Sequence, residues 1–358
     1  MSERVLMTGN DALAEAAIRA GCDAYFGYPI TPQNELAAYM AAHMPAHGRV
    51  FVQAESEVAA INMVLGASVT GKRAMTSSSS PGISLKQEAI SYLAANELPS
   101  VIVNVQRGGP GLGNILPSQS DYFQATKGGG HGDYRILVLA PASVQEMHDL
   151  TVEAFVLADR HRTPVMILAD GRLGQMMEPV ILRQGDAPPV PEKPWALTAC
   201  EGRKPRFIRS LILEEGALEA HNLKLQAKFK KTARETVKWE EFQTRDADVL
   251  VVAYGTSARI AKGAVKEARD AGIKAGLLRP ITLWPFPSRR IRALGSRARQ
   301  VLVVEMSSGQ MLEDVQLAVG DTVPLSFLGR MGGGIPDESA VLARIRKLAS
   351  GRRKEKRA

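Results

Sequence analysis

The chain has 358 residues, of which 45% are hydrophobic and 23% charged, as in an ordinary globular protein long enough for two domains with separate cores. Its only cysteines, Cys22 and Cys200, exclude a disulfide framework and an iron–sulfur cluster held by four thiolates of this chain. The net charge of +8 does not indicate a nucleic-acid surface, because eight basic residues and one acidic residue from 344 onward supply +7 of it.

The expected location of the protein follows from signals that the sequence lacks. No run approaches eighteen uninterrupted apolar residues, so no membrane span is expected. The first residues, MSERVLMTGND, contain no basic-then-apolar leader, so secretion is not expected either. Together with the two distant thiols, these features predict a cytoplasmic protein. The basic end is typical of a solvated tail, and docking to an acidic partner subunit is the alternative.

The first half of the chain alternates helix-like with strand-like stretches. Asn10 or Asp11 is expected to cap a helix that ends at Ala20, and a strand is expected over 24–27. Apolar spacing over 56–68 predicts a helix packed on a sheet. Further strands are expected at 73–76, 100–105, 136–139 and 164–168, and further helices at 83–95 and 143–159. This alternation predicts an α/β domain over 1–185, with a parallel sheet and helices on both faces.

The second half begins with a change of composition. Proline-rich residues 186–194 predict an extended linker, and a charged helical connector follows it, so that 186–245 separate two domains. A second α/β unit is expected over 246–345, and 346–358 form the basic tail. The expected elements of this second α/β unit are strands at 249–253, 275–278, 300–304 and 325–328 and a helix at 257–271.

Three polar side chains stand out in the first half. Thr31 precedes a proline in GYPITPQNEL (27–36), Glu57 opens an apolar helix in FVQAESEVAAINMVLGA (51–67), and Arg107 ends a strand in VNVQRGGPGLG (103–113). A carboxyl group in an apolar setting is suited to sharing a proton with a ligand. A guanidinium at the carboxyl end of a strand is placed to hold a substrate carboxylate.

Each of these residues also has a structural interpretation. Glu57 in a first helical turn can simply complement the helix dipole, and Arg107 can pair with a structural acid. Thr31, directly before proline, can be an ordinary turn residue. Position in the sequence alone does not decide between these interpretations and a catalytic site.

Five phrases together carry a resemblance to a known family. They are the three above, MTSSSSPGISLKQEAISYLAANELP (75–99) and PSQSDYFQATKGGGHGDYR (117–135). They resemble the 2-oxoacid:ferredoxin oxidoreductases, thiamine diphosphate enzymes that split 2-oxoacids and load the acyl group onto coenzyme A. The resemblance implies a pyrimidine-binding domain over 1–185 and a transketolase C-terminal-like domain over 246–345. GGGHGDYR and SSSSPGISLKQE look most like members acting on 2-oxoisovalerate, followed by those acting on 2-oxoglutarate and then on pyruvate.

The resemblance implies roles for the three polar residues. In the family, a glutamate at the place of Glu57 contacts N1′ of the aminopyrimidine and favours the imino form, whose N4′ removes the C2 proton. Glu57 is therefore the expected activating residue, with Glu55 as the second candidate. Arg107 is expected to hold the substrate carboxylate, and the Thr31 hydroxyl to donate to the 2-oxoacid or its adduct.

Further residues are expected to contact the cofactor or the substrate. The run of serines from 77 to 80 forms a strand-to-helix turn, and helix capping alone would explain only one of its hydroxyls. The resemblance implies cofactor contacts by Ser78, Ser79 and Tyr28. His131, in KGGGHGD, is expected to bind substrate or coenzyme A oxygens or to assist proton movement, and a merely solvated loop histidine is the alternative.

One missing motif concerns the other half of the cofactor. Thiamine enzymes usually hold the diphosphate and Mg²⁺ with Gly-Asp-Gly and a downstream Asn, whereas here Ala169 precedes Asp170 and no Asn follows until Asn222. The resemblance therefore implies that this chain binds no metal and that a partner subunit holds the diphosphate and Mg²⁺. Iron–sulfur clusters are expected in a ferredoxin-like subunit, with a gamma-type subunit and ferredoxin as further partners.

Two other functions remain open. One is a non-oxidative transketolase-like or decarboxylase half-enzyme, which would not copurify with a cysteine-rich cluster subunit. The other is a non-catalytic basic scaffold that binds acidic partners or nucleic acid, although it leaves Glu57 and Arg107 unexplained. A nucleotide site is not supported, because GASVTGKR (66–73) lacks the Ser or Thr that closes a P-loop.

Overall fold

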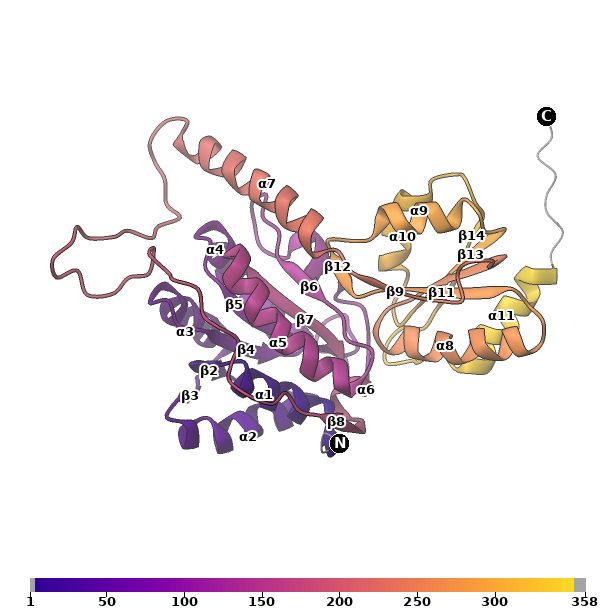
Figure 1. The fold of residues 1–358 in the computed structure, drawn as a ribbon, viewed down its shortest axis with the longest axis horizontal. Helices are drawn as coiled ribbons and strands as arrows, with labels where there is room; N and C mark the ends of the chain where they lie inside the picture. Colours follow the sequence, from indigo (N-terminus) through magenta and orange to yellow (C-terminus); the bar gives the residue numbers. More distant parts are fainter. Residues whose placement is uncertain (1–3, 351–358) are drawn as a thin grey trace.

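The computed structural model describes residues 4–350, which form two α/β units side by side (Figure 1). A seven-stranded sheet in the first unit has the order β12-β6-β7-β5-β4-β2-β3. Every pairing in it is parallel except that of β12 with β6. Its strands are β2 (Ala24–Gly27), β3 (Val50–Gln53), β4 (Ala74–Ser78), β5 (Ser100–Gln106), β6 (Leu137–Leu139), β7 (Pro164–Asp170) and β12 (Thr282–Trp284).

Helices cover both faces of this sheet, as predicted. One face packs against α1 (Gly9–Arg19), α2 (Asn34–His43) and α5 (Val144–His161) through a cluster that includes Leu13, Met40 and Phe155. The opposite face packs against α3 (Glu57–Val69) and α4 (Ser80–Ala95). β5 is buried along its whole length, and its apolar run at 101–103 fits a strand covered on both faces. Asn104 and Gln106, near its carboxyl end, are polar.

The second unit is smaller and is built in the same way. Its five-stranded sheet has the order β14 (Leu325–Gly329), β13 (Gln300–Glu305), β10 (Val249–Val252), β11 (Ala275–Pro280), β9 (Trp239–Phe242). The helices α8 (Gly255–Asp270) and α11 (Glu338–Ser350) cover one face. The opposite face packs on α9 (Ser288–Gly295) and α10 (Gln310–Val319), and that cluster is continuous with the core of the first unit.

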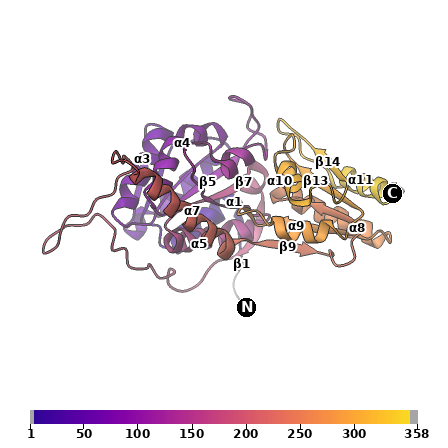
Figure 2. The same cartoon turned by 90° about the horizontal axis from the view of Figure 1, so that it is seen from above.

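The connection between the units contains a long helix, α7 (Ala217–Thr236), which agrees with the expected charged helical connector. His221 contacts the Ala95 carbonyl at 2.8 Å, and Lys228 donates to the Arg162 carbonyl at 2.9 Å, so α7 lies along the ends of α4 and α5. The segment before α7 forms a loop that extends away from the body in both views (Figures 1 and 2). The proposed boundaries at 185, 245 and 345 stay predictions.

Two local expectations need correction or extension. The predicted cap of α1 was wrong, because the Thr8 hydroxyl accepts the Asp11 N–H at 3.1 Å, and Asn10 instead donates to the Pro32 carbonyl at 2.9 Å. The strand β12 was not foreseen, although it belongs to the second half of the chain and completes the first sheet. Remaining unforeseen elements include β1 (Arg4–Thr8), which pairs with β8 (Met177–Ile181), and the short helices η1 (Pro45–His47), η2 (Gln124–Gly128) and α6 (Gly171–Gln175).

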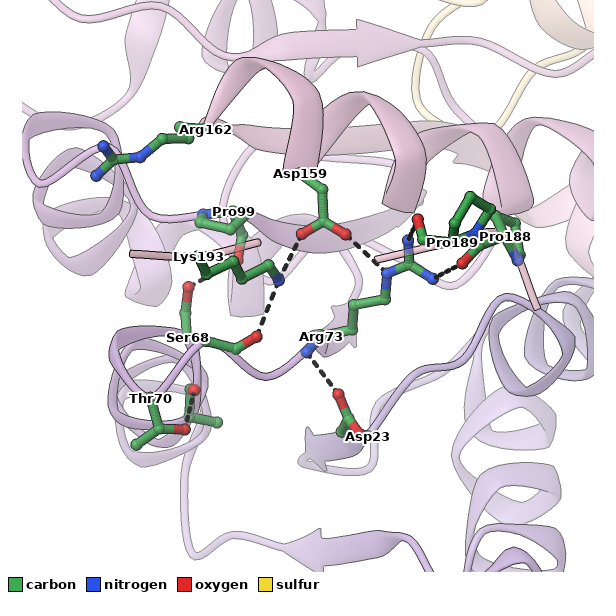
Figure 3. A network of polar contacts seen from close by, with 12 residues as sticks. Asp23, Ser68, Thr70, Arg73, Pro99, Asp159, Arg162, Pro188, Pro189 and Lys193 are labelled. Atoms are coloured by element: carbon green, nitrogen blue, oxygen red, sulfur yellow. Dashed lines mark hydrogen bonds and ion pairs between the residues drawn. The ribbon is translucent and has the colours of Figure 1, made fainter. Parts of the chain in front are cut away.

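A buried ion network holds the proline-rich linker against the first unit (Figure 3). Asp159 on α5 accepts from Arg73 at 2.8 Å and from Lys193 at 2.6 Å, and its side chain is 2% exposed. The Arg73 guanidinium also donates to the carbonyls of Pro188 at 2.9 Å and Pro189 at 3.2 Å. One carboxylate therefore holds two cations, and one of these cations binds the linker backbone.

Loss of this carboxylate is expected to be costly. Asp159→Asn leaves Arg73 and Lys193 buried without their counter-charge, so we expect the free energy of unfolding to fall by about 3 kcal/mol or more. Urea unfolding of the full chain measures the change. Asp149→Asn, on the same helix but with a side chain that is 56% exposed, is the matched control and should shift stability by about 0.5 kcal/mol at most. Equal stability of the two variants would contradict the proposed role of the network.

Candidate active site

The turn from β4 into α4 lies at the centre of the candidate site. In the serine run 77–80, the first and last residues already have hydrogen-bond partners within the chain. Ser77 contacts the Tyr25 hydroxyl at 2.6 Å, and the Ser80 amide donates to Asn104 Oδ1 at 3.1 Å. The hydroxyls of Ser78 and Ser79 are buried and have no hydrogen-bond partner among the described residues. Buried hydroxyls are normally paired, so two free ones at the start of a helix indicate a place for a polar ligand.

Glu57 lies beside this turn. It is the first residue of α3, after the cap Ser56, whose hydroxyl accepts the Ala59 N–H at 3.1 Å. The Glu57 side chain is 7% exposed, and no residue in 4–350 donates a hydrogen bond to its carboxylate. A Cβ added at Gly82 would lie 2.6 Å from Glu57 Oε1 and would overlap the Ser78 hydroxyl. The glycine thus leaves space for the Glu57 carboxyl to lie against α4, whereas Glu55 is exposed.

Arg107 and Thr31 meet on another side of the same turn. The Arg107 amide donates to the Ser80 hydroxyl at 3.0 Å, which ties the end of β5 to the start of α4. The guanidinium donates to the carbonyls of Thr31 at 3.0 Å and Leu112 at 3.2 Å, while its buried Nε has no partner among the described residues. The Thr31 hydroxyl accepts from Asn34 at 3.2 Å. Two fixed N–H groups orient the guanidinium plane and leave other donors for a carboxylate ligand.

The structure therefore gathers most of the expected residues around one turn. Ser80 links Arg107 to the start of α4, and Gly82, two residues further on, brings Glu57 to the same first turn of the helix. Tyr28 lies just after β2 and is exposed. The roles of Glu57, Arg107, Thr31, Tyr28, Ser78 and Ser79 in catalysis and binding remain predictions.

His131 is not part of this group within the chain. Its ring lies edge-on to Tyr92, with centroids 6.0 Å apart, and it is exposed. Tyr92 follows Ser80 by twelve residues on α4, which corresponds to about 18 Å along the helix. A role for His131 at the site would therefore require a bound molecule or partner chain that reaches both places, and that role stays a prediction.

The sequence interpretation overlooked Asp121. Its carboxylate accepts from the Ser80 hydroxyl at 2.6 Å and from Asn104 at 2.9 Å, and its backbone N–H donates to Gln106 at 3.0 Å. Burial raises the pKa of Asp121, although both side-chain hydrogen bonds oppose the shift. Asp121 also lines a cavity of about 420 Å³ with residues of the second unit, including Ser307. In the sequence, Asp121 appears only as the last residue of Ser-Gln-Ser-Asp (118–121). No known motif spacing gives an aspartate at that place a functional role.

Asp170, in the position of the missing diphosphate motif, is used within the fold. It accepts from the amides of Arg172 at 3.0 Å and Leu173 at 3.2 Å and from the Thr256 hydroxyl at 2.9 Å. It therefore caps α6 and joins the two units. Among residues 4–350, no group of three or more His, Cys, Asp or Glu side chains is arranged to hold a metal ion. In the same range, none of the helices combines the length and apolar character needed to cross a membrane.

In the second unit, Glu305 and the glycine-rich turn at 332–334 serve mainly in structure. Glu305 accepts from Ser307 at 2.8 Å and from the amides of Met311 and Leu312 at 2.9 Å each, and burial raises its pKa. Gly332 has a φ of 60°, and its carbonyl accepts from Asn114 at 2.9 Å. Since Asn114 lies in the loop after Arg107, the glycine-rich turn supports that loop.

Comparison with known families covers both units. Residues 15–240 match the model described as pyruvate flavodoxin/ferredoxin oxidoreductase, thiamine diphosphate-binding. Residues 247–341 match the model of pyruvate:ferredoxin oxidoreductase core domain II. These matches confirm the fold class expected from the sequence.

Curated relatives align along nearly the whole chain. Ketoisovalerate oxidoreductase subunit VorB of Methanothermobacter marburgensis is 52% identical, over 96% of this chain and 97% of the relative. The 2-oxoglutarate synthase subunit KorA of Methanothermobacter thermautotrophicus is 40% identical, over 97% of this chain and 100% of the relative.

Solved structures support the same architecture. The 2-oxoglutarate:ferredoxin oxidoreductase of Magnetococcus marinus, solved with 2-oxoglutarate, coenzyme A and succinyl-CoA bound, superposes with a TM-score of 0.88 at 27% identity. The match covers 98% of this chain and 66% of that larger chain. A split-gene transketolase, described as an inactive beta4 tetramer, matches with a TM-score of 0.59 at 14% identity, which indicates a shared fold only.

Proposed function

The chain belongs to the 2-oxoacid:ferredoxin oxidoreductase family, and we propose that it is the pyrimidine-binding subunit of a member that acts on 2-oxoisovalerate. The complex would carry out coenzyme A-dependent oxidative decarboxylation, releasing CO₂ and an acyl-CoA and reducing ferredoxin. The observation that carries the proposal is the set of free polar groups around the β4–α4 turn. Among the described residues, none donates a hydrogen bond to the Glu57 carboxylate, and the Ser78 and Ser79 hydroxyls and the Arg107 Nε are buried without a partner. All four groups lie around one helix start.

The residues present fit the aminopyrimidine half of thiamine diphosphate. Such a ring needs a carboxyl partner at one nitrogen and polar contacts around its edge, and Glu57, Ser78 and Ser79 offer groups that have no donor or partner within residues 4–350. When bound, thiamine diphosphate would supply a nucleophilic carbon for reaction at the 2-oxo group. Glu57 would share a proton with the ring nitrogen, and the burial of Glu57 between α3 and α4 would limit the access of water to that contact.

Arg107 and Thr31 are assigned to the 2-oxoacid. The Arg107 guanidinium, fixed by the Thr31 and Leu112 carbonyls, offers its remaining N–H groups to the substrate carboxylate. The Thr31 hydroxyl donates to the 2-oxo oxygen. His131, which is exposed beside Tyr92, is assigned a contact with substrate or coenzyme A oxygens.

The rest of the reaction is assigned to other subunits. The engagement of Asp170 as a helix cap supports a partner chain that holds the diphosphate and Mg²⁺. Iron–sulfur clusters are assigned to a ferredoxin-like subunit, since this chain has two cysteines. A gamma-type subunit and ferredoxin complete the proposed set of partners. The active site would then lie between two chains.

The choice of substrate follows the relatives. VorB is named for ketoisovalerate and is 52% identical, whereas KorA is named for 2-oxoglutarate and is 40% identical, so 2-oxoglutarate is the second candidate.

The purified complex, assayed with each 2-oxoacid, coenzyme A and a viologen dye, tests this choice. We expect kcat/KM for 2-oxoisovalerate to exceed that for 2-oxoglutarate and pyruvate by about tenfold or more. Higher kcat/KM for 2-oxoglutarate would overturn the substrate assignment, and aldehyde release without dye reduction would indicate the non-oxidative alternative. The chain alone, without partners, should be inactive.

A further inference from the structure

Lys86 is a buried cation that the proposed mechanism does not use. It lies in the middle of α4 with an exposed fraction of 0%, and its ammonium donates to the Thr76 hydroxyl at 2.8 Å. Within residues 4–350, Lys86 forms no ion pair with a carboxylate. Lysine is almost never fully buried without a partner, because an unpaired charge loses its hydration.

The position of Lys86 connects it to Glu57. Lys86 follows Gly82 by four residues on α4, so both residues lie on the same face of the helix. Gly82 is the residue against which the Glu57 carboxyl lies. Of the elements packed around Lys86, α3 contributes Glu57 and β4 contributes the neutral Thr76. Among the described residues, Glu57 is the one titratable group whose charge acts on Lys86.

The charge of Lys86 changes near neutral pH. Burial lowers the pKa of the Lys86 ammonium to about 7, and the negative charge of Glu57 opposes this shift. Near neutral pH, Lys86 therefore exists in both forms. Each form gives the Glu57 carboxyl a different electrostatic environment, because an ammonium attracts a carboxylate and a neutral amine does not.

We propose that Lys86 is a positioning residue that acts through Glu57, and that its ammonium form moves the proton shared by Glu57 and the cofactor ring toward the ring nitrogen. The inference rests on the proposed function, because it takes the ring nitrogen to be the partner of Glu57. One proton is shared in the contact. With Lys86 protonated, Glu57 is held as the carboxylate and the proton lies on the ring nitrogen. With Lys86 neutral, the proton returns to the carboxyl oxygen.

The first test needs no cofactor and measures the stability of the full chain against pH. The unfolded chain binds the Lys86 proton with an ordinary pKa of 10.5 and the folded chain with one of about 7, so the wild-type free energy of unfolding rises between these values. Below pH 7 the penalty of burying the ammonium is complete. Lys86→Met keeps an unbranched side chain without the charge, and the difference in stability between wild type and Lys86→Met should shrink as pH rises.

Glu57→Gln tests whether the charge of Glu57 acts on Lys86. Since the negative charge of Glu57 helps Lys86 hold its proton, the stability difference should begin to shrink at a lower pH in the Glu57→Gln background. A difference between wild type and Lys86→Met that is constant with pH, or unaffected by Glu57→Gln, would overturn the proposal.

The second test uses the assembled complex with thiamine diphosphate and follows hydrogen–deuterium exchange at C2 from pH 6 to 8.5. At pH 6, wild type should exchange about tenfold faster than Lys86→Met, and this ratio should approach one as Lys86 loses its proton. Lys86→Arg, which stays charged, should keep the advantage across the range. If wild-type exchange does not depend on Glu57, the proposed function fails. If exchange depends on Glu57 while the wild-type to Lys86→Met ratio is constant with pH, this inference alone fails.

Discussion

Glu57→Gln is expected to slow C2 hydrogen–deuterium exchange of bound thiamine diphosphate by about 10²- to 10⁴-fold, the usual contribution of a positioned proton-sharing group. The amide has the shape of the carboxyl group but can neither accept nor release the shared proton. Assembly should be retained, because no residue in 4–350 donates a hydrogen bond to the Glu57 carboxylate. Exchange is measured by NMR after acid quench of the assembled complex.

Glu55→Gln is the matched control for this result. Glu55 lies two residues earlier, carries the same functional group and is exposed, so its neutralisation should leave exchange within about twofold of wild type. An equal loss in both variants would mean that the effect comes from the charge of the loop rather than from a buried contact. Loss in Glu55→Gln alone would transfer the activating role to Glu55, the second candidate from the sequence.

Arg107→Lys is expected to lower kcat/KM for the 2-oxoacid by roughly a thousandfold, as expected when about 4 kcal/mol of a buried charge-assisted contact is lost. Lysine keeps the positive charge but loses the planar fork that holds two carbonyls and a carboxylate together. Thiamine diphosphate affinity should change little, since the substrate rather than the cofactor is assigned to Arg107. Steady-state kinetics and cofactor titration measure the two quantities.

Arg135→Lys is the matched control for Arg107. Arg135 also donates to two backbone carbonyls, those of Lys127 at 3.0 Å and Thr126 at 3.5 Å, but these lie in the short helix η2 that precedes it in the chain. Its replacement should leave kcat/KM within a few-fold of wild type. If Arg107→Lys lowered cofactor affinity and kcat/KM equally, Arg107 would support the β4–α4 turn instead of binding substrate.

The elements that the sequence predicted well are those governed by local periodicity. The apolar spacing of α3 depends on residues that are neighbours in the chain, and the apolar run at 101–103 in β5 reflects burial on both faces. The cap of α1 was misassigned because Asn10 has a distant partner in Pro32, and that competition is invisible to local rules. The pairing of β12 with β6 joins residues far apart in the chain, so no local signal announces it.

The candidate site shows the same division. Glu57, Arg107 and Thr31 were found because the phrases around them resemble a family. Only the folded structure shows that all three lie around the β4–α4 turn. Asp121 and Lys86 were missed, because an aspartate in a loop and a lysine on a helix are ordinary until burial removes their water.

Residue order was enough to identify the family, the α/β class and the residue types available for proton sharing and carboxylate binding. The packing of the chain was needed to find which described groups lack partners, as for the hydroxyls of Ser78 and Ser79, and which charges act on each other, as for Lys86 and Glu57. Helices and strands form from interactions between chain neighbours, whereas desolvation and hydrogen-bond satisfaction depend on every element that packs around a group.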